Sequence, residues 1–412
     1  MTATPPPMSR MAPGLVALFA LSCGIAAANL YYAQPLLPQI SHDLSVGSGT
    51  AALVVTAAQV GYGIGLALVV PLGDILVRRR LVPGMLILAA GALILASAAP
   101  DIAVLAGALV VAGLCSVVAQ ILVPFAASLA SDDERGRVVG TVMSGLLIGI
   151  LLARTFSGLI AAAAGWRTVY VAAGAMVALL SGLLYRTLPA ETERPPIVYS
   201  RLLVSVVDLM RAEPLLRLRS AIGGLSFATF NVIWTSLAFL LAGPPYHYGE
   251  AVIGLFGLLG VAGALAASFS GRLADRGYER AVSGGSLVAT VGAVGLLALG
   301  AHQLWALVVG IVLADLGIQA VHIQNQQLIL AIDPAARSRL NTGYMVTYFV
   351  GGSIGSATTG LAYGIDGWSA VILLGLCYST AGLTLWVVSE VTRRRGRPAP
   401  ARTRSGWTGS GP

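Results

Sequence analysis

The run RGRVVGTVM at residues 135–143 returns as RSRLNTGYM at residues 337–345, and both runs begin with two arginines one residue apart. The two runs start 202 residues from each other. Further landmarks keep a separation of 201 or 202 residues: Asn29 and Asn231, Asp74 and Asp275, and Gly165-Trp166 and Gly367-Trp368. Repetition at one constant offset indicates that the chain contains two copies of one unit.

The composition indicates the solvent in which these units fold. Hydrophobic residues make up 57% of the chain, charged residues only 10%, and the mean hydropathy is +0.84. A soluble domain carries about 25% charged residues, so the composition indicates an integral membrane protein. A membrane-spanning helix needs about 20 apolar residues. The sequence therefore predicts an all-α membrane fold of twelve transmembrane helices in two six-helix repeats. The predicted spans are 14–37, 50–71, 81–99, 102–127, 138–162, 167–187, 220–243, 251–271, 281–300, 304–329, 340–363 and 367–389.

The arginines predict the orientation, because positively charged loops stay on the cytoplasmic side and the chain has no lysine. Alternate loops and the two termini hold 23 of the 25 arginines, so both termini are expected in the cytoplasm. The net charge of +8 is spread over short segments beside membrane helices and does not form one groove. Membrane topology accounts for this charge, and no nucleic-acid partner is expected.

The predicted organisation has five parts. A cytoplasmic tail at 1–13 precedes an N-terminal six-helix bundle at 14–187, and a connector at 188–219 leads to a C-terminal bundle at 220–389. The tail at 390–412 is rich in Arg, Pro, Gly and Ser and is expected to be disordered. Within the connector, apolar residues at helical spacing between Tyr199 and Arg211 predict a short interfacial helix.

The clearest local motif is GRLADRG at 271–277, which has a degenerate partner, PLGDILVRRR, at 71–80. This loop, its duplication and the twelve helices resemble the major facilitator superfamily over about residues 12–390. A carboxylate at a helix end beside arginines can pair across two bundles and hold one face shut. The alternative is a turn whose charges only set topology. The candidate gating residues are Gly73, Asp74, Arg78, Gly271, Asp275 and Arg276.

Two further segments narrow the resemblance. ANLYYAQPLLPQI at 28–40 and GWRTVY at 165–170 are similar to the bacterial drug/proton antiporter branch of twelve-helix exporters. That branch implies efflux and multidrug resistance at the cytoplasmic membrane. Two positions depart from its pattern, because Leu109 stands where an intramembrane arginine is usual and ARTFSG at 153–158 replaces the glycine-proline signature. The proton mechanism of the branch is therefore not carried over.

The chain has its own intramembrane charges. Asp315 lies in the middle of the tenth predicted span and Arg154 lies inside the fifth. A charge at the bilayer centre costs about 2.5–3.5 kcal/mol on insertion scales, so it indicates a functional group that faces protein or water. Gln319, His322 and Gln326 follow Asp315 on the same helix face.

These residues support one hypothesis and two alternatives. We expect Asp315 to bind and release a coupling proton, with His322 or Arg154 modulating it. Arg154 would equally stabilise an anionic substrate, and a purely structural ion pair between Asp315 and Arg154 is the third interpretation.

Polar and aromatic side chains on the first, second, fourth, seventh, tenth and eleventh spans predict a mixed apolar and hydrogen-bonding substrate cavity. Each residue alone is also compatible with core packing or interfacial anchoring. The candidates are Asn29, Tyr32, Gln59, Gln120, Phe227, Asn231, Trp234, Gln319, Tyr344 and Tyr348, with Tyr62 and Asn341 as additions. Intramembrane glycines, such as Gly145 with Gly149 and Gly351 with Gly355, predict close helix packing.

No catalytic grouping stands out, since the chain has no HExxH pair and no Walker phosphate loop. One match to the GxSxG pattern, GGSIG at 351–355, lies inside a predicted membrane span and not at the strand-to-helix turn that a nucleophile elbow needs. Neither a cofactor nor a metal is expected, and the three cysteines fall in different apolar spans. The predicted function is proton-coupled efflux of a small amphipathic molecule by a monomer in the bacterial inner membrane. Proton symport or facilitated diffusion of a sugar, nucleoside or other nutrient is the alternative. A membrane enzyme, a receptor or a channel belongs to a different class and is disfavoured.

Overall fold

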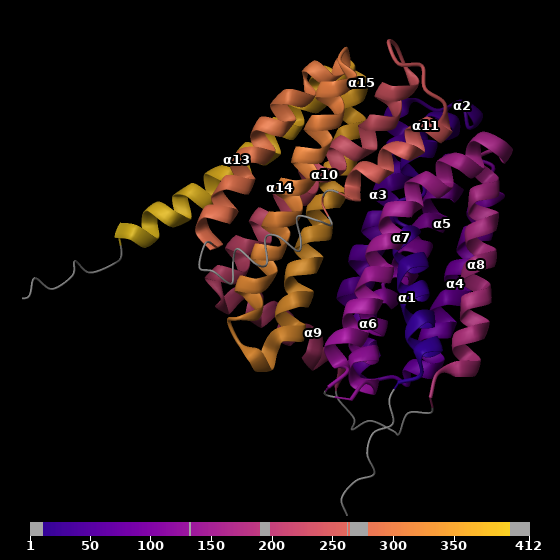
Figure 1. The fold of residues 1–412 in the computed structure, drawn as a ribbon, viewed down its shortest axis with the longest axis vertical. Coiled ribbons are helices and arrows are strands. Elements are labelled where there is room, and N and C mark those ends of the chain that lie inside the picture. The colour runs from indigo at the N-terminus through magenta and orange to yellow at the C-terminus, as the bar shows by residue number, and fades with distance from the viewer. Residues whose placement is uncertain (1–10, 132, 190–197, 262, 264–278, 396–412) are drawn as a thin grey trace, which may run out of the picture.

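The structure is a computed structural model of the 412-residue chain. It describes residues 11–131, 133–189, 198–261, 263 and 279–395. The described segments are helical, and they form two groups of helices that stand side by side (Figure 1).

The first half of the chain, shown in indigo to magenta in Figure 1, is built from long helices joined by short turns. Its helices are α1 (Pro13–Ala28), α2 (Leu37–Asp43), α3 (Ser48–Ile64), α4 (Arg78–Ser97), α5 (Ile102–Ser116), α6 (Val118–Leu129), α7 (Arg135–Ala164) and α8 (Trp166–Thr187). Short helical turns extend α1 and α3, namely η1 (Gln34–Leu36), η2 (Gly65–Val69) and η3 (Val70–Asp74).

The second half, shown in pink to yellow, has the same plan. Its helices are α10 (Pro214–Ala242), α11 (Glu250–Leu255), α13 (Glu279–Leu297), α14 (Leu304–Leu330) and α15 (Arg337–Arg395), with η4 (Phe256–Gly260) after α11, η5 (Leu299–Ala301) and η6 (Pro334–Ala336). α10 begins six residues before the predicted span, because Pro214 occupies the first turn, where the missing N–H costs nothing.

Nine helices of the described residues are long and apolar enough to cross a membrane. One of the nine, α15, contains two predicted spans, 340–363 and 367–389, which a short non-helical break at Asp366 and Gly367 separates. The first predicted span is the shorter helix α1, and the described part of the eighth is the short apolar helix Glu250–Gly260. The full count of twelve stays a prediction.

The sequence repeat is visible in the backbone at the two Gly-Trp pairs. Gly165 and Gly367 both have positive φ, +82° and +55°, where a side chain would be strained. Trp166 donates its indole N–H to Asp43, and Trp368 donates its own to the carbonyl of Leu297. We call the end of the molecule at these pairs the Gly-Trp end, and the opposite end, where Arg135 and Arg337 begin their helices, the arginine end.

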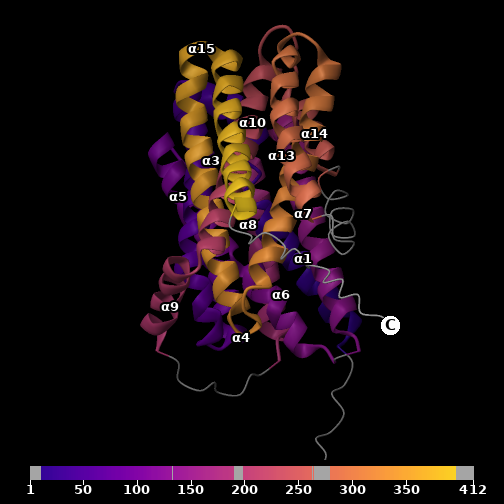
Figure 2. The ribbon, with the colours of Figure 1, turned by 90° about the vertical axis from the view of Figure 1, so that its left-hand side faces the viewer.

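The connector contains the expected short helix, α9 (Tyr199–Ala212), which lies at the arginine end (Figures 1 and 2). The Tyr199 hydroxyl donates to the carbonyl of Leu68 at 2.6 Å. On the other side, Met210 packs beside Gly343 of α15. α9 therefore contacts both halves of the molecule.

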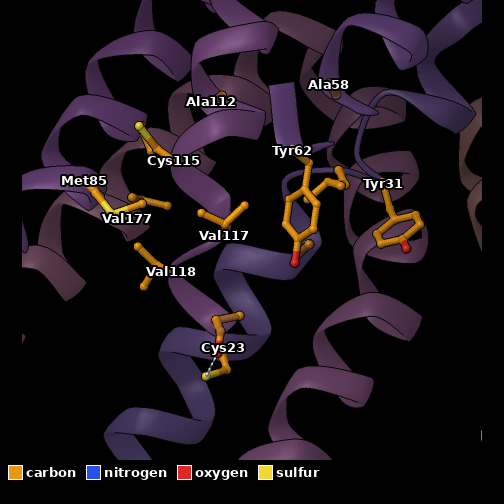
Figure 3. Packing of buried hydrophobic residues seen from close by; sticks show 14 of the residues in the cluster. Cys23, Tyr31, Ala58, Tyr62, Met85, Ala112, Cys115, Val117, Val118 and Val177 are labelled. Atoms are coloured by element: carbon orange, nitrogen blue, oxygen red, sulfur yellow. Dashed lines mark hydrogen bonds between the residues drawn. The ribbon is translucent and has the colours of Figure 1, made fainter. Parts of the chain in front are cut away.

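Small residues let the helices within each half pack backbone to backbone. A Cβ on Gly149 would lie 2.4 Å from the Cα of Gly24, and one on Gly351 would lie 2.6 Å from the Cα of Gly224. The close packing predicted from these glycines is confirmed. Figure 3 shows the apolar core of the first half, where the Cys23 thiol faces the carbonyl of Ala119 at 4.0 Å.

Candidate functional site

The two halves meet along two seams near the Gly-Trp end. In the α7–α11 seam, a Cβ on Gly254 would lie 3.0 Å from the Cα of Gly158. In the α3–α15 seam, a Cβ on Gly49 would lie 2.7 Å from the carbonyl oxygen of Gly360. Figure 2 shows α3 beside α15 at the upper end of the molecule. Both seams depend on glycine, because any side chain would push the halves apart.

Arg154 lies in the α7–α11 seam and is only 3% exposed. Its Nε donates to the Gln34 side-chain oxygen at 2.5 Å, whereas its Nη2 is buried and has no hydrogen-bond partner among the described residues. The centre of the guanidinium lies 3.9 Å from the ring of Trp234, 4.8 Å from that of Tyr31 and 5.7 Å from that of Phe230. The cation is therefore surrounded by aromatic rings from both halves.

Asp315 of α14 is 4% exposed and faces the same Trp234. The indole N–H of Trp234 donates to Asp315 Oδ1 at 3.1 Å. Asp315 and Arg154 interact electrostatically but form no direct ion pair in the described part of the chain, and both contact the indole of Trp234. We call Arg154, Trp234 and Asp315 the Arg-Trp-Asp unit.

The polar stripe of α14 continues from Asp315 toward the arginine end. His322 Nδ1 lies 3.0 Å from the Tyr344 hydroxyl, and its ring lies 4.6 Å from that of Tyr348. Gln326 donates to the Asn341 side chain at 3.3 Å. His322, Gln326 and also Gln319 are half-buried, unlike Asp315. His322 and Gln326 thus face α15 within the second half.

Aromatic rings extend this region across to the first half. Phe227 stacks on Tyr348 with ring centres 4.1 Å apart, and Tyr62 packs 4.4 Å from Phe349. Gln120 donates to the Tyr62 hydroxyl at 3.2 Å. The structure therefore brings candidates from α3, α6, α10 and α15 together.

The equivalent asparagines of the two repeats have different partners. Asn231 accepts a hydrogen bond from Gln59 at 3.3 Å, and this bond crosses between the halves. Asn29 instead donates to Ser116 at 3.1 Å, inside the first half. Tyr32 packs on Phe156, also inside the first half, with ring centres 6.2 Å apart.

The candidate gating residues of the first repeat lie at the arginine end. Arg78 donates from Nε to the Gly73 carbonyl at 3.0 Å, and its Nη2 lies 3.6 Å from Asp74. Its guanidinium also covers the ring of Phe125. These contacts hold η3 to α4 and α6 within one half. The second-repeat candidates Gly271, Asp275 and Arg276 lie outside the described residues.

Sequence reasoning missed Gln34 and Tyr31. Gln34 is 1% exposed and is the hydrogen-bond acceptor of Arg154. A polar side chain inside the predicted span 14–37 was a signal that could have identified it, since buried polar groups need partners. Tyr31 had no such signal, because aromatic residues are common near the ends of membrane helices.

Comparison with known proteins identifies the class of protein. The model of the Major Facilitator Superfamily matches residues 19–301 and 220–410, so the chain belongs to this superfamily of membrane transporters.

Several relatives span nearly the whole chain. The chain is 45% identical over 380 residues to the transporter YgaY of Escherichia coli K12, covering 92% of this chain and 96% of that one. It is 36% identical to the transporter SCO4007 of Streptomyces coelicolor, covering 93% and 87%. Among solved structures, a bacterial homologue of the human lysosomal transporter Spinster, in an inward-facing and occupied conformation, matches with a TM-score of 0.74 and 14% identity. That match covers 94% of this chain and 98% of the other.

Proposed function

We propose that this transporter exports a small amphipathic molecule across the bacterial inner membrane, and that Asp315 binds and releases the coupling proton. The sequence contains no Walker phosphate loop, which favours the gradient of an ion or of the substrate as the source of energy. Each 100 mV of membrane potential supplies about 2.3 kcal/mol per charge moved.

The Arg-Trp-Asp unit is the observation that carries this proposal. Asp315 and Trp234 belong to the second half, and Arg154 belongs to the first. A carboxylate accepts a stronger hydrogen bond than a neutral acid does, so protonation of Asp315 weakens the anchor of the indole. The same indole ring also contacts the guanidinium of Arg154. The proton state of one side chain is therefore linked to a contact between the halves.

This link gives a route to alternating access. With the arginine end in the cytoplasm, the two glycine seams lie toward the outer face of the membrane. Rocking of the halves would part the seams and expose the region between α7, α10, α14 and α15 to the outside. The substrate would contact the aromatic and amide groups between the halves, including Phe227, Trp234, Asn231 and Tyr348.

The test is a growth assay in an efflux-deficient bacterial host exposed to antibiotics, dyes and metabolites. The host would express the native chain, Asp315→Asn or the control Asp208→Asn at matched membrane levels. Asp208 is an exposed carboxylate of α9 and makes a suitable control. We expect native protein and the control to protect against some compounds and Asp315→Asn to fail. Full protection by Asp315→Asn would refute the proton role.

Uptake by proton symport is the second candidate, and the unpartnered Nη2 of Arg154 favours it. An anion bound there would favour a protonated Asp315, so that proton and substrate would bind together. Membrane vesicles with an imposed proton gradient separate the two directions. Substrate that moves with the protons indicates symport, and substrate that moves against them indicates antiport.

A further inference from the structure

We infer that Arg154 is the anchor of an anion-binding site, and that the transported molecule carries a carboxylate on an apolar or aromatic body. The inference rests on the proposed location of the transport site between the halves. It does not depend on the direction of transport.

The surroundings of Arg154 leave one side of its guanidinium without a partner. A guanidinium has two flat faces for aromatic rings and an edge of N–H donors for acceptors. The rings of Trp234 and Tyr31 pack against the guanidinium group of Arg154. Along the edge, Nε is bonded to Gln34, while the buried Nη2 has no acceptor among the described residues.

Among the described residues, no carboxylate forms a direct ion pair with this cation. Asp315 is the only acidic residue in the middle of a predicted span, and its Oδ1 accepts from the indole N–H of Trp234 and forms no direct ion pair with Arg154. Gln34 is neutral and supplies one acceptor. A buried cation with a single neutral acceptor is costly, and an N–H donor without a partner adds to that cost. A carboxylate ligand would correct both deficits, since it brings a negative charge and two acceptor oxygens.

The neighbouring rings indicate what the rest of the ligand is like. Phe230 stacks on Phe227, which in turn stacks on Tyr348. These rings form one continuous aromatic stack from Arg154 toward α15. An apolar or aromatic body would pack along this path, whereas a small inorganic anion would leave it unused.

Proton and anion should bind cooperatively. Among the described residues, the ionisable side chains that interact electrostatically with Asp315 are Arg154 on α7, Tyr348 on α15, and Tyr31 between α1 and η1. A bound anion would compete with the Asp315 carboxylate for Arg154, the one cation among them. We therefore expect carboxylate binding to tighten as the pH falls.

The experiment measures ligand-induced thermal stabilisation of the purified full-length protein. The probes are benzoate, 2-naphthoate and indole-3-acetate, each compared with its neutral amide. We expect at least one carboxylate to stabilise the native protein while its amide does not. If no carboxylate exceeds its amide, the inference is wrong.

Variants locate the site. Arg154→Gln should weaken carboxylate binding about tenfold or more, because it removes a charged hydrogen bond. Arg154→Lys keeps the charge and should retain part of the affinity, which makes it informative if Arg154→Gln fails to fold. Arg201→Gln, an exposed arginine of α9, is the matched control. Equal binding by the native protein and both Arg154 variants would overturn the assignment.

Asp315→Asn separates this inference from the proposed proton role. If both are correct, the variant binds the carboxylate tightly and loses the pH dependence of binding. Carboxylate binding at Arg154 with the same pH dependence in Asp315→Asn would reject the proton role and keep the anion site. If Asp315→Asn loses the pH dependence of binding but the Arg154 substitutions leave carboxylate binding unchanged, the proton role is kept and the anion site is rejected.

Discussion

The two seams between the halves have the same backbone design but different side-chain chemistry. Gly158 of the α7–α11 seam and Gly360 of the α3–α15 seam are 202 residues apart, the offset of the repeat. Each packs against the opposite half with no room for a side chain. Four residues earlier, however, the first seam has Arg154 and the second has Ser356.

The chemistry of the second seam is neutral. Ser356 and Thr56 share one hydroxyl hydrogen bond of 2.9 Å. In the first seam the equivalent position reaches Trp234 and, through its indole, Asp315. Duplication thus accounts for the glycine contacts, and divergence of single positions placed the charges in one seam alone. The comparison predicts that equivalent substitutions will have unequal effects on transport.

The largest effect is expected from Arg154→Ser, which gives the first seam the residue of the second. Removal of the guanidinium takes away the cation–π contact and the charge that faces Asp315, so we expect proton-driven transport to be lost. The measurement is the initial rate of transport in membrane vesicles under a proton gradient. Transport above about a tenth of the native rate would contradict the proposed role of the charge.

Trp234→Phe should have the next largest effect. The ring that covers Arg154 is kept, but the N–H that donates to Asp315 is lost. A hydrogen bond to a charged group contributes about 1.5–3 kcal/mol, so we expect the rate of proton-driven transport to fall tenfold or more. The expected signature is a shifted pH profile of transport. The matched control is Tyr32→Phe, at the equivalent position of the first repeat, which should leave the profile unchanged.

Gly254→Ala and Gly49→Ala test the glycine contacts that the two seams have in common. Each new Cβ would meet backbone atoms of the other half, Arg154 O at 2.6 Å or Gly360 O at 2.7 Å. Overpacking of this kind costs about 1–3 kcal/mol. Both variants should therefore increase the fraction of molecules in which the halves have separated along the seams.

Labelling of Thr155→Cys, in a background without the native cysteines, by a membrane-impermeant maleimide reports that shift. Labelling should rise in both variants by similar factors. A rise in only one of them would show that the two seams are not equivalent.

The smallest effect is expected from Ser356→Ala. It removes one hydroxyl hydrogen bond, and such bonds between membrane helices average about 0.6 kcal/mol. Transport should change less than about threefold. A loss as severe as that of Arg154→Ser would mean that the neutral seam also takes part in coupling.

The sequence predicted the parts of this account that depend on spacing along one helix. The duplication paired Gly165 with Gly367, and the structure shows that both have positive φ. Glycine spacing predicted close helix packing, which Gly149 and Gly351 show. Asp315 and Arg154 stood out because charges inside a membrane span are costly.

Relations between helices could not be read from spacing. Helical periodicity places Trp234 on a face of its own helix but does not show that its indole contacts both Arg154 and Asp315. The sequence predicts one helix over the first span, 14–37, whereas α1 ends at Ala28 and the chain continues through η1. Gln34 occupies that irregular segment, where periodicity gives no direction for its side chain.

The most direct test of the central claim follows proton movement in liposomes that contain the purified transporter. A substrate gradient, without a pH gradient, would be applied with a compound identified by the growth assay, and a pH-sensitive dye would report the lumen. The account predicts substrate-dependent proton movement for the native protein and for Asp208→Asn, but none for Asp315→Asn. Native rates of proton movement in Asp315→Asn would contradict it.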